Sequence, residues 1–173
     1  MQVFPKKYLT VGGTARDGTL LIMVQGAMYD VERGGVQGYV DACAHALDTM
    51  FPDAGGGDVG KITLLIDIRG FDKSDDVDFR NCPATQMIPF FRACSKTLSA
   101  NYPDRLEKIV LYTIPWFLAG VVNLVRKVLP RELNDKFVIL AGKNARDTPK
   151  GLWEIVDEEM IHEMKRKYHV NVV

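Results

Sequence analysis

The stretch at residues 102–142 constrains the fold more than any other part of the sequence. Residues 107–114 form a short run rich in Ile, Val, Leu and Tyr, which is typical of a strand buried on both faces. Pro115 ends this run, because proline has no N–H to give to a sheet. Residues 117–129 are too long for a strand and mostly apolar, which predicts a helix with a wide apolar surface. Residues 136–141 are a second apolar run, so the order strand, helix, strand predicts a parallel crossover unit.

The rest of the chain extends this unit into an α/β domain. Apolar runs predict strands at 19–24 and 61–68, and apolar spacings of three and four predict helices at 36–51, 83–101 and 152–168. Pro89 falls in the first turns of the second of these helices, and Gly34-Gly35 marks a break before the first. Residues 3–14 read as irregular. We therefore expect one domain over 1–173, with a mostly parallel central sheet and helices on both faces.

Several short motifs in this order resemble the CRAL-TRIO family of lipid-binding and lipid-transfer domains. They are Tyr102-Pro103-Asp104-Arg105-Leu106, Pro115-Trp116-Phe117, Lys136-Phe137 and Leu140-Ala141-Gly142, preceded by Phe4-Pro5-Lys6-Lys7-Tyr8, Asp17-Gly18 and Asp67-x-x-Gly70-Phe71. The resemblance implies a CRAL-TRIO-like lobe, with the sequence starting at the lobe and without the small helical lobe that precedes it in many members. It also implies that helix 117–129 is the gate over a lipid-sized cavity.

The resemblance further implies a binding site for a lipid or another small hydrophobic molecule, between the sheet and the gate helix. The expected lining residues are Phe117, Leu118, Val121, Val122 and Val125 on the helix, with Ile66, Phe90, Leu111 and Thr113 as walls. Three cations are candidates for a head-group phosphate: Arg126, Lys127 and Lys136. The sequence lacks the Leu-Pro-x-x-x-Gly-Gly signature that carries a phosphoinositide-contacting lysine in the family. Phosphatidylinositol is therefore one candidate lipid among others.

The helix at 117–129 also leaves alternatives open, because its only polar residues are Asn123, Arg126 and Lys127. One face can pack on the sheet, and the other can meet more core, an apolar ligand, or a membrane or protein surface. The alternative function is a protein-interaction module, as in CRAL-TRIO domains of small-GTPase regulators. The gate helix would then bind a partner protein or a second copy of the chain.

No pattern in the sequence indicates an enzyme, a metal site or a bound cofactor. We find no nucleophile elbow, H-E-x-x-H motif, dinucleotide fingerprint or Cys/His metal spacing. Asp67 lies near the carboxyl end of a predicted strand, where open α/β sheets place ligands. It is the one candidate for an enzymatic role, and its alternative roles are to cap a turn or to pair with Arg69.

The amino-acid composition argues against some classes of function and indicates the cellular compartment. Lys and Arg number 22 and Asp and Glu number 22, so no basic excess favours nucleic-acid binding. Three cysteines without C-x-x-C spacing, Cys43, Cys82 and Cys94, are typical of reduced thiols in a cytosolic chain. No apolar segment resembles a signal peptide or reaches the roughly 20 residues of a membrane span. We therefore expect a cytoplasmic protein that contacts membranes peripherally.

Overall fold

The computed structural model describes residues 8–51, 60–68, 84–102, 104–115, 119–128, 131–142 and 149–169. Its helices and strands alternate along most of the chain. In chain order they are β1 (Leu9–Thr14), β2 (Leu20–Gln25), η1 (Gly26–Met28), α1 (Val31–Met50), β3 (Ile62–Asp67), η2 (Ala84–Met87), α2 (Ile88–Asn101), β4 (Leu106–Pro115), α3 (Ala119–Val128), α4 (Arg131–Asn134), β5 (Phe137–Gly142), η4 (Lys150–Glu154) and α5 (Glu158–His169), where η marks a 3-10 helix.

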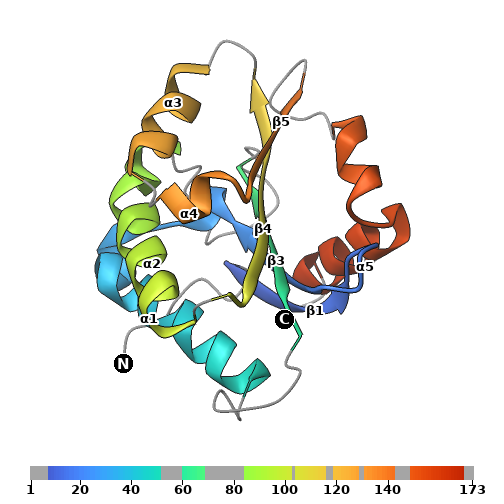
Figure 1. The fold of residues 1–173 in the computed structure, drawn as a ribbon, viewed down its shortest axis with the longest axis horizontal. Coiled ribbons are helices and arrows are strands. Elements are labelled where there is room, and N and C mark those ends of the chain that lie inside the picture. Colours follow the sequence, from blue (N-terminus) through green and yellow to red (C-terminus); the bar gives the residue numbers. More distant parts are fainter. Residues whose placement is uncertain are drawn as a thin grey trace.

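The five strands form one sheet in the order β1-β2-β3-β4-β5. Strands β2 to β5 are parallel to their neighbours, and β1 pairs antiparallel with β2 at the edge. Helices α1 to α4 lie on one side of the sheet, and α5 lies on the other (Figure 1). The predicted α/β architecture, with a mostly parallel sheet and helices on both faces, is confirmed.

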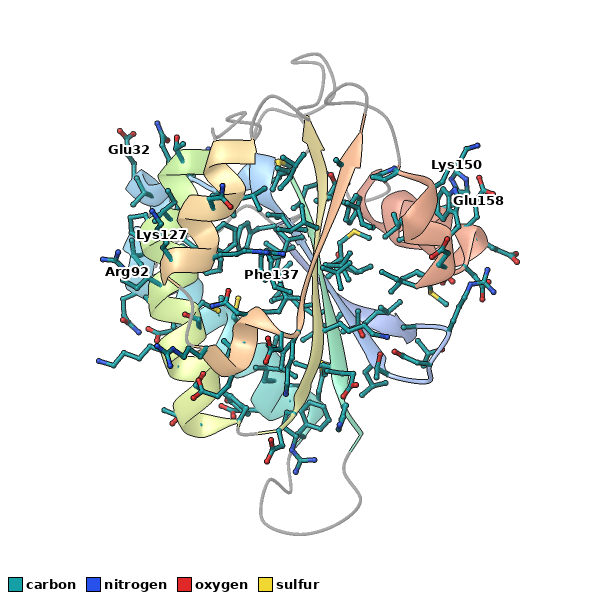
Figure 2. The ribbon with its side chains drawn as sticks, turned by 45° about the horizontal axis from the view of Figure 1, so that its top comes forward. Glu32, Arg92, Lys127, Phe137, Lys150 and Glu158 are labelled. Carbon is teal, nitrogen blue, oxygen red and sulfur yellow. The ribbon has the colours of Figure 1, made fainter. Side chains whose placement is uncertain are left out.

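Side chains alternate between the two faces of the sheet, as the pleat requires. In β2, Ile22 and Val24 belong to the large core under α1 and α2, whereas Leu21 and Met23 belong to the smaller core under η4 and α5. Phe137 of β5 lies between the sheet and the helix layer (Figure 2). Both faces are covered, which explains why these strands are continuous apolar runs.

The prediction of an irregular segment at 3–14 is wrong for its second half, which forms β1. The sequence hides this strand because Gly12 and Gly13 interrupt its apolar pattern. Both glycines have positive φ, at 147° and 86°, and the pairing with β2 shifts between Val11 and Thr14. Glycine adopts these angles without steric cost, so the bulge allows a strand that sequence propensity disfavours.

The prediction of a continuous helix at 152–168 is also wrong. A 3-10 helix, η4, precedes α5, and the two are separated at Ile155–Asp157. Arg16, in the turn between β1 and β2, stabilises this junction between η4 and α5. Its Nε donates to the carbonyl of Trp153 at 2.7 Å, and its guanidinium pairs with Asp157 at 2.5 Å. These tertiary contacts favour the break over a helix that the apolar spacing alone permits.

Helix α1 begins one turn earlier than predicted. Asp30 caps it by accepting a hydrogen bond from the Glu32 amide at 3.1 Å, and the chain then passes through Gly35 at φ 62°. The predicted break at the Gly-Gly pair is therefore real, but a helical turn precedes it. Proline Pro89, within the first two residues of α2, starts that helix after the 3-10 turn η2.

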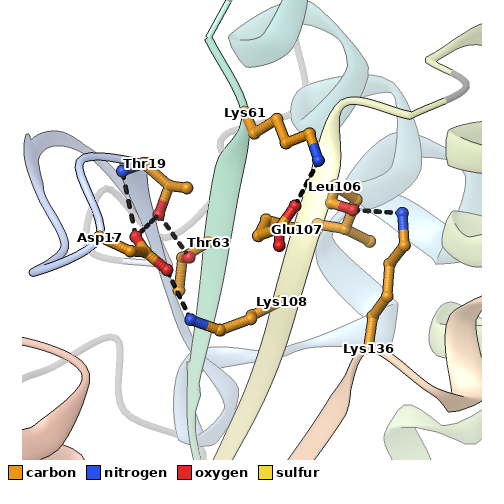
Figure 3. Close-up of polar contacts among 8 residues, drawn as sticks. All are labelled: Asp17, Thr19, Lys61, Thr63, Leu106, Glu107, Lys108 and Lys136. Atoms are coloured by element: carbon orange, nitrogen blue, oxygen red, sulfur yellow. Dashed lines mark hydrogen bonds and ion pairs between the residues drawn. The ribbon is translucent and has the colours of Figure 1, made fainter.

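A polar cluster ties the β1–β2 turn to the beginnings of β3 and β4 (Figure 3). Asp17 accepts hydrogen bonds from the amide and hydroxyl of Thr19, and pairs with Lys108 of β4 at 2.5 Å. The Thr19 hydroxyl lies 2.6 Å from the Thr63 hydroxyl. The Lys108 ammonium, followed by these hydrogen bonds, lowers the pKa of Asp17 to about 2.

We expect Asp17 to make stability pH-dependent on the acid side. Its pKa is about 2 when folded and 3.8 in the reference state, so its stabilisation is complete above about pH 5 and is lost as pH falls towards 2. Allowing for solvent screening, the Asp17 side chain being 34% exposed, the loss should be about 1 kcal/mol. Urea unfolding of wild type and Asp17→Asn at pH 3 and pH 6 measures it. Asp41→Asn, at an exposed position of α1, is the control, and equal pH slopes in wild type and Asp17→Asn would contradict the prediction.

Candidate functional site

A small apolar cavity lies between the sheet and helices α1 and α2. Its volume is about 40 Å³, which is far below the roughly 300–1,000 Å³ of pockets that enclose drug-sized ligands. Every strand contributes to its wall, and so do three helices. The lining residues are Leu9, Ile22, Val24, Cys43, Leu47, Ile62, Leu64, Ile66, Phe90, Phe91, Cys94, Ser95, Leu98, Leu106, Ile109, Leu133 and Phe137. A water molecule would find too few hydrogen-bond partners in an apolar cavity of this kind.

Two of the predicted wall residues, Ile66 and Phe90, line this cavity. Leu111 lies in the same core cluster on the same face of the sheet, and Val122 of α3 packs against that cluster. These four residues therefore share one layer, between the sheet and the helices. Their contact with a lipid remains a prediction.

For each of the other predicted lining residues, either the whole residue or its side chain lies outside the part of the chain that the structure describes. Phe117 and Leu118 lie outside the described residues altogether. Val121 and Val125 belong to α3 and Thr113 to β4, where only the backbone is described. The proposed gate, and a partner protein or second copy bound through it, therefore remain predictions.

Two thiols from facing helices line the same cavity. Cys43 comes from α1 and Cys94 from α2. A hydrogen bond with Cys94, followed by burial, raises the pKa of the Cys43 thiol well above its usual value. Both cysteines are free, and a protonated thiol is a poor nucleophile. The pair thus behaves as part of the apolar wall.

Aromatic residues close the layer beside these thiols. The rings of Tyr8 and Tyr39 meet edge-on with centroids 4.5 Å apart, and Phe90 lies 6.0 Å from Tyr8. Burial raises the pKa of Tyr8 well above its usual value. Its hydroxyl has no hydrogen-bond partner among the described residues. Sequence reasoning missed Tyr8 and Tyr39 as neighbours of the cavity, because they lie far apart along the chain.

A second, polar pocket of about 360 Å³ opens at the amino-terminal ends of β4 and β5. It is lined by Leu98, Ser99, Tyr102, Asp104, Leu106, Glu132, Leu133 and Lys136. Lys136, one of the predicted head-group residues, donates to the carbonyl of Leu106 at 2.6 Å (Figure 3). Arg126 and Lys127 are exposed in the last turn of α3. The structure therefore separates Lys136, which lines a pocket, from the two solvent-exposed cations.

Asp67 ends β3 and is only 2% exposed. Its backbone carbonyl lies close to Gly26, where an added Cβ would approach it to 3.3 Å. This close packing leaves no open space beside the strand end on that side.

The comparison with protein families decides which group the chain belongs to. The family model described as the CRAL/TRIO domain matches residues 5–164. The chain belongs to the CRAL/TRIO family. The resemblance expected from the motifs is thereby confirmed over most of the chain.

Two known proteins are similar to parts of this chain. Phosphatidylinositol transfer protein PDR17 of Saccharomyces cerevisiae is 31% identical over 67 residues, which are 39% of this chain and 18% of that protein. The crystal structure of Sfh5 matches 77% of this chain and 48% of its own, with a TM-score of 0.53 and 15% identity. The second match shows a shared fold. The chain spans less than half the length of either relative.

Within the described parts of this CRAL/TRIO domain, no helix is both long and apolar enough to cross a membrane.

Proposed function

We propose that this CRAL/TRIO domain binds a lipid or a similar hydrophobic molecule between its sheet and its helices, and carries it between membranes. The observation behind the proposal is an apolar cavity in that layer of a domain whose family binds and transfers lipids. The named relative is a phosphatidylinositol transfer protein. That name makes phosphatidylinositol the first lipid to test, together with peripheral contact with the membrane that supplies it.

In this proposal the structure corresponds to a closed form, since its apolar cavity measures only about 40 Å³. A lipid chain needs far more than 40 Å³, so the helix layer must move away from the sheet as the chain enters. Helix α3 is the proposed gate, since it packs against α2 and carries Val122 onto the core. Burial of the chain would supply roughly 25 cal/mol per Å² of apolar surface, part of which offsets the opening.

Lipid uptake from vesicles tests the proposal. Purified protein is incubated with vesicles of phosphatidylcholine and phosphatidylinositol, separated from them, and analysed by native mass spectrometry. We expect one lipid molecule per chain. A protein that remains free of lipid after exposure to both would overturn the proposal.

A cavity-filling variant makes the test specific to this layer. Cys43 is half-buried and lines the cavity, so the ring of Cys43→Phe should occupy space that the lipid chain needs and weaken uptake about tenfold. Cys43→Ala, which leaves the cavity open, should retain uptake and is the matched control. Equal uptake by the two variants would place the lipid elsewhere.

A further inference from the structure

The polar pocket and the apolar cavity are neighbours that share part of their walls. Leu98 of α2, Leu106 of β4 and Leu133 of α4 line both spaces. The three side chains are 8%, 4% and 6% exposed and come from three different elements. They therefore form a septum between the apolar cavity and the polar pocket.

This septum is held by side-chain packing alone. Leucine side chains make no hydrogen bonds, and each atom contact contributes only about 0.1–0.2 kcal/mol. Small rotamer changes of the three leucines would join the spaces without breaking a strand pairing. The septum is thus a passage that an alkyl chain can open.

The passage lies at the amino-terminal end of β4, whereas the proposed gate helix α3 begins beyond the other end of that strand. The polar pocket surrounds Leu106, the first residue of β4, whereas the chain leaves β4 for α3 after Pro115. Ten residues of strand separate these ends, a distance of roughly 30 Å. A molecule entering through the septum would not pass the start of α3.

The charges that line the polar pocket determine which kind of ligand it attracts. Among the described residues that line it, Asp104 and Glu132 supply two carboxylates and Lys136 supplies one ammonium. That ammonium already donates a hydrogen bond to the Leu106 carbonyl. The described lining residues together carry one negative charge, so they attract a cationic group and repel an anionic one.

We propose that this polar pocket is a head-group chamber for a single-chain amphiphile with an ammonium head, whose alkyl chain passes the leucine septum and enters the apolar cavity as the helix layer moves away from the sheet. The inference rests on the proposed function, because it assigns that function's cavity a second entrance and a ligand class. The mixed lining fits one molecule with a charged head and an apolar chain. Asp104 and Glu132 contact the ammonium, and the three leucines contact the first methylenes.

Two probes that differ only in head-group charge test the chamber. Octylamine is protonated and octanoate is ionised at pH 7, and their chains make the same apolar contacts. We expect octylamine to bind about fivefold to tenfold tighter by calorimetry, the effect of a unit charge close by in a solvent-exposed pocket. Glu132→Gln should reduce this ratio several-fold. Glu158→Gln, on the opposite side of the sheet, is the matched control and should leave it unchanged.

Amide chemical shifts of the wild-type protein locate the probe without any substitution. Octylamine should perturb residues 98–106 and 132–137. Leu133→Ala, which thins the septum, should speed association of octylamine. Perturbation at the carboxyl ends of the strands instead, or equal affinities for the two probes, would overturn the chamber.

The outcomes separate this proposal from the one on which it rests. If neither probe binds while the protein takes up vesicle phospholipid, the chamber is wrong and lipid binding stands. If the protein binds neither the probes nor any vesicle lipid, both proposals fail.

Discussion

Phe90→Ala should lower the free energy of unfolding by about 3–5 kcal/mol, the usual loss for truncating a buried phenylalanine. Phe90 is 2% exposed, touches the Tyr8 and Tyr39 rings, and lines the apolar cavity. Its removal would add the volume of a benzene ring to the apolar cavity that it lines, so the surrounding side chains can fill little of the space. Urea unfolding measures the loss, and thermal unfolding should shift by about 6–20 °C for a domain of this size.

A small apolar ligand distinguishes an enlarged cavity from general damage. Engineered cavities lined by Leu, Ile and Phe stay dry and bind benzene, so saturating benzene should raise the melting temperature of Phe90→Ala more than that of wild type. Arg92→Ala, at an exposed position of the same helix, should change stability by no more than about 0.5 kcal/mol. A Phe90→Ala protein as stable as Arg92→Ala would show that the helix layer packs differently.

Ile161→Asp should have an effect of similar size on the opposite face of the sheet. Ile161 of α5 is fully buried, with Leu65 and Val110 in the same cluster. The substitution removes a buried apolar side chain and leaves a carboxyl group without a partner, at a combined cost of about 4–6 kcal/mol. Circular dichroism during urea unfolding measures this loss.

The control for this variant lies on the same turn. Glu159→Asp keeps an exposed carboxylate on α5 and should change stability by no more than about 0.5 kcal/mol. If Ile161→Asp unfolds at the same urea concentration as the control, α5 contributes nothing to the cooperative core.

The strands and helices that bury apolar runs could be predicted from the sequence. The expected strand at 107–114 is β4 (Leu106–Pro115), and the expected helix at 117–129 contains α3. Here local pattern and tertiary packing favour the same structure. They differ at β1, where a glycine bulge follows no propensity rule, and at the η4–α5 junction. That junction depends on Arg16, which lies 137 residues away from Trp153 in the sequence.

The candidate site, like the fold, could be predicted from the sequence only in part. The apolar wall around Ile66 and Phe90 could be anticipated, because buried faces of strands and helices follow from periodicity. The polar pocket could not be predicted, because nothing in the local sequence around Asp104 or Glu132 indicates that these two residues lie close together in space. Only the parallel pairing of β4 with β5 brings these two acids to one edge of the sheet.

The bulge in β1 has a consequence for how the molecule behaves in a crowded solution. A regular outermost strand offers an evenly spaced row of free backbone donors and acceptors, on which a foreign chain can polymerise. At Gly12 and Gly13 the backbone departs from this regular spacing, and the register of the pairing between β1 and β2 shifts. The two glycines therefore protect the domain from fibrous self-association at the one antiparallel edge of its sheet.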